Sequence, residues 1–204
     1  MEEIQLNSNE IAAENEDCSD ISLRLMDVND IDDMMLWATD DNVSKYCSWS
    51  TYTSKQQAID YMANTVTPHP WWRAICLKNR AIGSISVTPF TGNDVCRGEL
   101  GYVLASNYWG KGIVTRAVEM VVSMIFVEWP HLERLEALVD VENVGSQKVM
   151  EKAGFKREVE LRFSVGNFKN CTCLRGLNSS QLGNFLLDRF IRINKKSTPS
   201  SVAE

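Results

Sequence analysis

The clearest pattern in the chain is an alternation of hydrophobic and polar positions that gives way to helical spacing. Over residues 99–104 the larger side chains Leu100, Tyr102 and Leu104 share one face, opposite Glu99, Gly101 and Val103. From residue 113 the apolar positions follow helical spacing, with a polar side opposite; they are Ile113, Ala117, Met120, Val121, Met124 and Ile125, against Lys111, Arg116, Glu119 and Ser123. The pattern predicts a strand, a glycine-bearing loop and a long amphipathic helix.

The loop between this strand and helix has the features of an anion site. Gly110 and Gly112 can adopt backbone angles closed to other residues and carry no side chain to obstruct a ligand. The helix N-terminus adds about half a positive charge at the same place. Lys111 and the hydroxyl of Thr115 could supplement the backbone. A Gly-x-Gly pair alone is also compatible with a simple tight turn, so both interpretations stay open at this point.

Similar patterns predict the other elements, which together indicate a mixed α/β sheet with helices on both faces. We expect strands at 21–25, 73–77, 81–87, 135–141 and from Phe155, and helices at 30–39, 55–65 and from Asn143 to Gly154. Residues 78–80 should turn a hairpin. Between the first two helices, Tyr46, Trp49 and Tyr52 could either pack in the core or form the wall of a pocket.

Charge is unevenly distributed along the 204 residues, of which 44% are hydrophobic. The net charge of −6 arises in residues 1–20, which hold seven acidic and no basic residues, so that 20 acidic residues face 21 basic ones in the remainder. A nearly neutral domain of this kind is not expected to bind nucleic acid by electrostatic attraction. No apolar run reaches membrane length and the acidic start is unlike a signal peptide, so we expect a cytoplasmic protein that does not bind membranes.

The six cysteines are not arranged as a metal site. They show no CxxC pair, and only His69 and His131 could add imidazole ligands, so no metal is expected. Without a secretory signal we interpret the cysteines as small, partly buried thiols. No histidine stands in a motif that would activate a cysteine as a nucleophile.

Three segments together resemble the GNAT acetyltransferases, and most closely their ribosomal-protein-alanine branch. These are Glu99-Leu-Gly-Tyr-Val-Leu104, Asn107-Tyr-Trp-Gly-Lys-Gly112 and, downstream, Asn143-Val-Gly-Ser-Gln-Lys-Val-Met-Glu-Lys-Ala-Gly-Phe155. They occur in the family's order, within a resemblance that runs from about residue 21 to about residue 161. It implies an α/β (α+β) acyl-CoA N-acyltransferase fold, a mixed and mostly antiparallel sheet flanked by helices. It also implies acetyl-CoA as cosubstrate and a primary amine as acceptor.

The resemblance assigns roles to residues around the loop. Its loop pattern, Gln/Arg-x-x-Gly-x-Gly/Ala, binds the pyrophosphate of acetyl-CoA, and Asn107 stands at the Gln/Arg position, a departure from the pattern. The residues that it places against the cofactor are Val103, Leu104, Asn107, Trp109, Gly110, Lys111, Gly112, Ile113, Val114, Thr115 and Asn143. The backbone N–H groups of Val103 and Leu104 would hold the thioester carbonyl and the pantetheine arm. Asn143 is also explained as a plain helix cap.

Two side chains are candidates for proton transfer. Glu99 lies on the sparse face of the strand that leads to the loop and is the candidate base; alternatively it is a strand carboxylate paired with Arg97 or another cation. Ser146, in the first turn after Asn143, is the candidate acid for the departing thiolate. A serine is a poor acid, and the thiolate can also take its proton from water.

The C-terminal part departs from the family, in which two strands follow the position of Phe155 and complete the sheet. Residues 163–180 are rich in turn formers, so we expect a variant ending that leaves the sheet short by a strand and the acceptor side open. We accordingly expect an acidic disordered arm at 1–20, the acetyltransferase domain at 21–176, an amphipathic helix at 177–194 and a disordered tail at 195–204.

The sequence leaves the acceptor and the oligomeric state open. By resemblance, the acceptor amine is either a protein N-terminus or a small molecule such as a polyamine or an amino sugar. Two other functions are compatible with the same residues: a module that binds acetyl-CoA without turnover, and an α/β protein that binds nucleotide phosphates.

Overall fold

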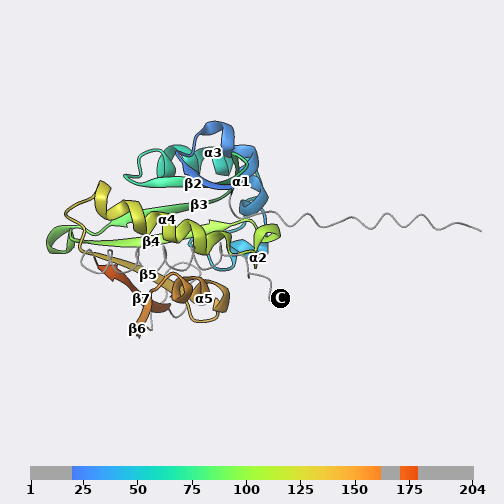
Figure 1. The fold of residues 1–204 in the computed structure, drawn as a ribbon. Helices are drawn as coiled ribbons and strands as arrows, with labels where there is room; N and C mark the ends of the chain where they lie inside the picture. The colour runs from blue at the N-terminus through green and yellow to red at the C-terminus, as the bar shows by residue number, and fades with distance from the viewer. Residues whose placement is uncertain (1–19, 162–170, 179–204) are drawn as a thin grey trace, which may run out of the picture.

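A sheet of seven strands crosses the molecule in the order β1-β2-β3-β4-β5-β7-β6 (Figure 1). The computed structural model describes residues 20–161 and 171–178. The strands are β1 (Ile21–Arg24), β2 (Trp72–Leu77), β3 (Arg80–Pro89), β4 (Arg97–Leu104), β5 (Arg134–Asp140), β6 (Lys156–Leu161) and β7 (Cys171–Asn178). Only β4 and β5 are parallel neighbours among these strands, and the other neighbours are antiparallel. The mixed, mostly antiparallel sheet expected from the sequence is therefore confirmed.

Helices cover both faces of the sheet, and each face has its own hydrophobic cluster. The helices are α1 (Ile31–Ala38), α2 (Asp41–Ser44), α3 (Lys55–Tyr61), α4 (Ile113–Glu128) and α5 (Val144–Lys152), with short helical turns at Val28–Asp30, Met62–Val66, Gly92–Asp94 and Ser106–Tyr108. Side chains of α1 and α3 pack together on one face. On the other face α4 lies along the sheet with α5 beside it. The glycine-bearing loop between β4 and α4 therefore joins the centre of the sheet to its longest covering helix.

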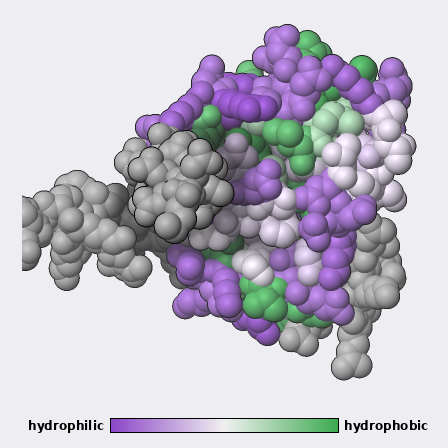
Figure 2. All heavy atoms as spheres, turned by 90° about the vertical axis from the view of Figure 1, so that its right-hand side faces the viewer, coloured by the Kyte–Doolittle hydropathy of each residue, from purple (hydrophilic) through white to green (hydrophobic). Residues whose placement is uncertain are grey.

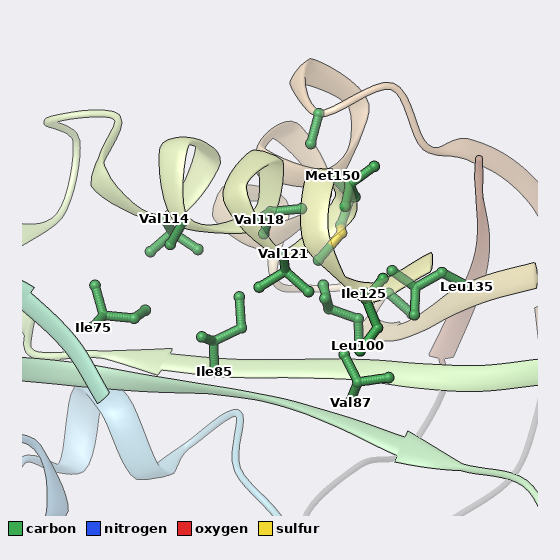
Figure 3. Packing of buried hydrophobic residues seen from close by; sticks show 14 of the residues in the cluster. Ile75, Ile85, Val87, Leu100, Val114, Val118, Val121, Ile125, Leu135 and Met150 are labelled. Carbon is green, nitrogen blue, oxygen red and sulfur yellow. The ribbon is translucent and has the colours of Figure 1, made fainter. Parts of the chain in front are cut away.

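The apolar stripe of α4 faces the sheet as its spacing predicts. Figure 3 shows Val114, Val118, Val121 and Ile125 along the helix above Ile75, Ile85, Val87 and Leu100 of the strands. Burying each such side chain contributes about 1.5–3 kcal/mol, so this contact holds the N-terminus of α4 firmly against the sheet. Leu100 and Leu104 join this cluster whereas Val103 packs on the opposite one, which confirms the two faces predicted for β4.

The hairpin and the cap predicted from the sequence are also present. Lys78 and Asn79 have φ values of 50° and 67°, which are the left-handed angles that a tight hairpin turn between β2 and β3 requires. Asn143 caps α5, since its side-chain oxygen accepts a hydrogen bond from the N–H of Ser146 at 3.0 Å. The cap fixes the start of α5, the helix that carries Ser146.

Three local expectations need correction. A short helix, α2, starts immediately after Asp40, whose side chain accepts a hydrogen bond from the N–H of Asn42, where the sequence predicted only a loop. The helix expected over 55–65 changes to a wider π turn at Met62. Glu119, expected on the exposed side of α4, is buried. The prediction failed because the hydrophobic period of a helix shows which face is apolar, but not how far neighbouring segments cover the polar face.

The expectation of a missing strand is wrong. Residues 171–178 form β7, which inserts between β5 and β6 and pairs with both. Thr172, Cys173 and Leu174 are all buried, which is typical of a strand covered on both faces. The strand runs to Asn178, so it includes the first two residues of the helix expected over 177–194. The rest of that helix, the tail at 195–204 and residues 1–19 of the acidic arm lie outside the described residues.

Within 20–161 and 171–178, none of the helices combines the length and the apolar character that crossing a bilayer would need.

Candidate active site

A cavity of about 790 Å³ lies where β4, β5, the loop before α4 and the start of α5 meet. Its wall contains every site residue predicted from the sequence except Asn107 and Lys111: Glu99, Val103, Leu104, Trp109, Gly110, Gly112, Ile113, Val114, Thr115, Asn143 and Ser146. Figure 2 looks onto the side of the molecule where α2 and the glycine loop lie, and there hydrophobic residues show between hydrophilic ones. The fold thus gathers segments far apart in the sequence around one hollow.

The cavity opens between β4 and β5 because these parallel strands pair only at their beginnings. The pairing runs from Arg97↔Arg134 to Glu99↔Glu136, and beyond it β4 continues to Leu104 with no strand partner on that side among the described residues. A diverging pair of strands leaves backbone N–H and C=O groups directed into the gap, where an extended ligand can bind as an added strand.

The hydrogen bonds at the two ends of the β3–β4 ladder show which amides point into the gap. The N–H of Phe90 donates to Arg97 at 3.0 Å, and the N–H of Ala105 donates to Ile82 at 2.9 Å. Because an antiparallel ladder uses every second residue, Val103 directs its amide to β3 and Leu104 directs its amide to the gap. Of the two backbone groups expected to hold the cofactor, only that of Leu104 faces the cavity; Val103 offers its side chain.

The loop before α4 is arranged as an open cradle. Gly110 and Gly112 have φ values of 76° and 80°, and a Cβ atom added at either would meet no atom within 4 Å. Gly112 caps α4, a helix of 16 residues, so the first amides of that helix point out of its N-terminus beside the cavity. The loop therefore combines left-handed glycines, empty space and a helix N-terminus, as a phosphate site requires.

Side chains around the loop have different roles. The indole N–H of Trp109 donates to the carbonyl of Leu104 at 2.9 Å, which ties the loop to the end of β4. Ile113 and Val114 are buried and anchor the helix start. Lys111 is exposed and its Nζ lies 5.4 Å from the ring centre of Tyr108. Asn107 is also exposed, outside the cavity wall.

Glu99 is half-buried at the deep end of the gap and is not paired with Arg97. The guanidinium of Arg97 instead donates to Glu136 at 2.5 and 2.9 Å and to Asp94 at 3.0 Å. Within the described segments no hydrogen bond or ion pair engages the side-chain carboxylate of Glu99, and its register neighbour on β5 is Glu136. Burial, and then the negative charge of Glu136, raise the pKa of Glu99. A carboxylate with a raised pKa and no cation is suited to accept a proton.

Glu136 keeps its charge because two arginines hold it. Its carboxylate accepts from Arg97 and lies 2.8 Å from the Nε of Arg134. The hydrogen bond from Arg97 lowers the pKa of Glu136 against the effect of its burial. The register neighbour of Glu99 on β5 is therefore a carboxylate whose ionised form is stabilised by arginines.

The far side of the gap holds Ser146 and a phenol that the sequence analysis did not single out. Tyr102 donates its O–H to the backbone carbonyl of Ser146 at 3.4 Å, and both residues line the cavity. Burial raises the pKa of Tyr102 to about 12. A phenol is a stronger acid than a serine hydroxyl, so Tyr102 is a second candidate proton donor here. In the sequence Tyr102 shares the face of Leu100 and Leu104, which predicts packing and gives no sign of a role in the site.

Aromatic rings form the side of the cavity that faces α1 and α3. Tyr46 and Trp49 line the cavity, whereas Tyr52 is buried beneath them, with its ring centre 5.2 Å from that of Trp49. The aromatic cluster predicted between the first two helices thus supplies both wall and core. Tyr61 and Trp72 extend the wall, with ring centres 6.0 Å apart.

Comparison with known proteins gives one family. Residues 20–156 match the family model described as an acetyltransferase (GNAT) domain. The chain is 30% identical over 148 residues to an uncharacterized N-acetyltransferase p20 of Bacillus licheniformis, covering 70% of this chain and 82% of that protein.

Two solved structures share the fold. Spermidine N-acetyltransferase from Vibrio cholerae, in complex with CoA and spermine, superimposes with a TM-score of 0.68 at 18% identity, covering 81% of this chain and 99% of that one. RimL, a ribosomal L7/L12 alpha-N-protein acetyltransferase in complex with coenzyme A, gives a TM-score of 0.67 at 16% identity, covering 78% and 94%. The first of these enzymes is named for spermidine and the second for a ribosomal protein, although their folds are similar to that of this chain to nearly the same degree. Similarity of fold therefore does not select the ribosomal-protein branch.

Proposed function

The chain belongs to the GNAT acetyltransferase family, and from that membership and its site we propose that it transfers the acetyl group of acetyl-CoA to a primary amine. The observation that carries the proposal is the meeting of three features in one cavity. These are the gap between β4 and β5, the open glycine loop at the start of α4, and the unpaired carboxylate of Glu99. An acyl transfer needs orientation, a route for the proton of the amine and a place for a phosphate-bearing carrier.

The residues present fit acetyl-CoA. The open space at Gly110 and Gly112 leaves room for a pyrophosphate at the helix N-terminus, and Lys111 and Thr115 stand close enough in sequence to add polar contacts. The amide of Leu104 would hold the arm that enters the gap, and Asn143 lines its other side. When bound, acetyl-CoA supplies an acetyl group on a thioester sulfur, and the reaction exchanges its C–S bond for a C–N bond.

Glu99 is the residue that we assign to the proton of the amine. An ammonium group cannot attack a carbonyl, so its proton must leave first. Burial, and then the charge of Glu136, raise the pKa of Glu99, which brings it closer to the pKa of an amine than that of an exposed glutamate. Direct transfer and transfer through one water are both compatible with its position in the wall.

On the other side of the gap, Ser146 and Tyr102 are the groups that could give a proton to the sulfur. The hydroxyl of Tyr102 is already oriented by the carbonyl of Ser146. Removing the Tyr102 hydroxyl should therefore slow the reaction more than removing that of Ser146, unless the thiolate leaves unassisted.

A thiol-release assay tests the proposal. Purified protein is incubated with acetyl-CoA and a mixed panel of amines, free coenzyme A is measured, and mass spectrometry identifies the amine that gains an acetyl group. Release above the rate without amine supports transfer. Binding of acetyl-CoA by calorimetry without any release would instead establish a cofactor-binding module, and preference for ATP over acetyl-CoA would contradict the assignment of the loop.

A further inference from the structure

We propose that the acceptor is a primary amine with a single positive charge and an aromatic or similarly large apolar body, and that Ser84 and Ser86 select it through hydrogen bonds. This inference rests on the proposed acetyl transfer and names the substrate class of the same site. Three properties of the wall on the side of α1, α3 and β3 carry it: its charge, its aromatic rings and a row of hydroxyls on β3, of which Thr88 contacts His69 at 3.0 Å and the other two are free of such a partner within the described residues.

The first property is the scarcity of negative charge. Among the described residues, Glu99 is the only carboxylate that the wall carries on this side; the other acids of the cavity, Asp140 and Glu142, lie at the end of β5 and just after it, before α5, whose Lys148 and Lys152 also line the cavity. Burial raises the pKa of Tyr61, so this phenol stays neutral. Each further ammonium of a polyamine or an aminoglycoside would lose water without gaining a carboxylate, which is unfavourable. The wall therefore suits one positive charge, placed at Glu99.

The second property is the aromatic surface. Trp49, Tyr61 and Trp72 line this side, and Tyr61 and Trp72 meet edge to face. The indole N–H of Trp72 is buried and has no hydrogen-bond partner within the described part of the chain. Buried donors are rarely left unpaired, and an oxygen atom of an acceptor lying on this wall would satisfy it. Aromatic walls bind apolar or aromatic bodies in offset and edge-to-face contacts.

The third property is a row of hydroxyls on β3. Ser84, Ser86 and Thr88 face the cavity at every second position, and the register places them opposite Val103, Gly101 and Glu99. Ser84 and Ser86 are 3% and 9% exposed, yet no hydrogen bond joins either hydroxyl to another described residue. Gly101 keeps the floor open, since a Cβ atom there would lie 3.6 Å from the Oγ of Ser86. Two hydroxyls thus face the cavity with free capacity.

The spacing of this row relates the hydroxyls to the amine. Residues two apart on a strand are separated by about 7 Å, so Ser86 lies about that far along the floor from the level of Glu99 and Thr88. An acceptor whose nitrogen is at Glu99 would place a carbonyl or hydroxyl group of its body at Ser86. Both a free aromatic amine with a ring hydroxyl and the N-terminus of a peptide have this chemistry.

Steady-state acetylation with a panel of amines tests the class. We expect kcat/KM for tyramine or for a Phe-Ala dipeptide amide to exceed that for spermidine and for kanamycin by at least about tenfold. A preference for tyramine would indicate that the natural acceptor is a small molecule, and a preference for the dipeptide amide would indicate a peptide N-terminus. Equal or better use of the two polycations would overturn the inference while leaving acetyl transfer established.

Variants test the hydroxyls. Loss of one neutral hydrogen bond corresponds to about a three- to tenfold change in affinity. Ser86→Ala should therefore raise KM for tyramine or the dipeptide amide by that factor and leave KM for 2-phenylethylamine, which has no oxygen, unchanged. Ser22→Ala on the exposed face of β1 is the matched control. If neither Ser84→Ala nor Ser86→Ala changes any KM, the assignment of the hydroxyls is refuted.

A binding measurement separates this inference from the proposed function. Calorimetry of each amine with the full-length protein reports affinity without chemistry. Tighter binding of tyramine than of spermidine, with no thiol release from any amine, would support the acceptor class and refute the transfer. Equal or tighter binding of spermidine would refute the acceptor class whatever the activity.

Discussion

Replacing Gly112 by valine should abolish acetyl-CoA binding while the protein stays folded. The φ of Gly112 is 80°, and forcing a side-chain-bearing residue into the left-handed region costs about 1–2 kcal/mol. No atom lies within 4 Å of the position of an added Cβ, so the Cβ atom itself adds no clash to this cost. The free energy of unfolding of a globular domain is about 5–15 kcal/mol. The variant should therefore remain folded and melt cooperatively, at a lower temperature.

The effect on the cofactor should be much larger than the effect on stability. The valine side chain would occupy the open space through which a pyrophosphate approaches the amides of the helix N-terminus. Losing two charge-assisted hydrogen bonds of about 1.5–3 kcal/mol each corresponds to a roughly hundred- to ten-thousandfold weaker affinity. Isothermal titration calorimetry with acetyl-CoA measures this, and thermal unfolding of the same sample verifies the fold.

Gly92→Val is the matched control. Gly92 also has a left-handed φ, 68°, and also has nothing within 4 Å of an added Cβ, but it lies in the turn before β4 and not in the cavity wall. It should lose similar stability and keep its affinity for acetyl-CoA. Undiminished affinity in folded Gly112→Val, or equal weakening in Gly92→Val, would refute the assignment of the loop.

Three further changes test the site and the sheet. Glu99→Gln should lower kcat/KM at neutral pH by about a hundredfold or more and leave acetyl-CoA affinity unchanged; an unaltered pH–rate profile would assign Glu99 a structural role. Glu136→Gln should shift the acidic limb of kcat/KM to lower pH, because the charge of Glu136 contributes to the raised pKa of Glu99 and its removal lets Glu99 lose its proton earlier; an unmoved limb contradicts this coupling. Gly176→Ala should lower the free energy of unfolding by about 1–3 kcal/mol, since its Cβ would lie 2.7 Å from the carbonyl oxygen of Leu135. The control Gly145→Ala, whose Cβ would have its nearest atom at 3.6 Å, should change this free energy little. Equal unfolding temperatures of the two variants would show that β7 adapts freely.

The central part of the fold was predictable because its signals are local. The alternation over 99–104, the two glycines and the helical period from Ile113 lie within one continuous stretch, so a strand, a loop and a helix could be predicted from neighbouring residues alone. The same holds for the cap at Asn143, whose side chain bonds an amide three residues away. Most of the cavity wall followed from these segments and the family resemblance.

What the sequence did not reveal depends on contacts between distant segments. Gly176 appears in the sequence as a turn former, but in the fold it sits where the backbone of Leu135 and the ring of Phe155 leave no room for a side chain. The role of Arg97 was equally hidden, because its partner Glu136 is supplied by the next strand. The position of Ser84 and Ser86 beside the cavity likewise depends on the register of β3 and β4, which places them opposite Val103 and Gly101.

The position of β7 has a consequence for how the chain folds during synthesis. The ribosome makes β5 and β6 first, yet in the sheet they are joined only through β7, residues 171–178, which is made after both and lies between them. Until then β5 exposes an apolar edge, a surface on which nascent chains aggregate or recruit chaperones. Closure of this half of the sheet is therefore a late event in translation, and any change of the message that alters residues 171–178 acts on the yield of folded protein before it acts on the chemistry of the site.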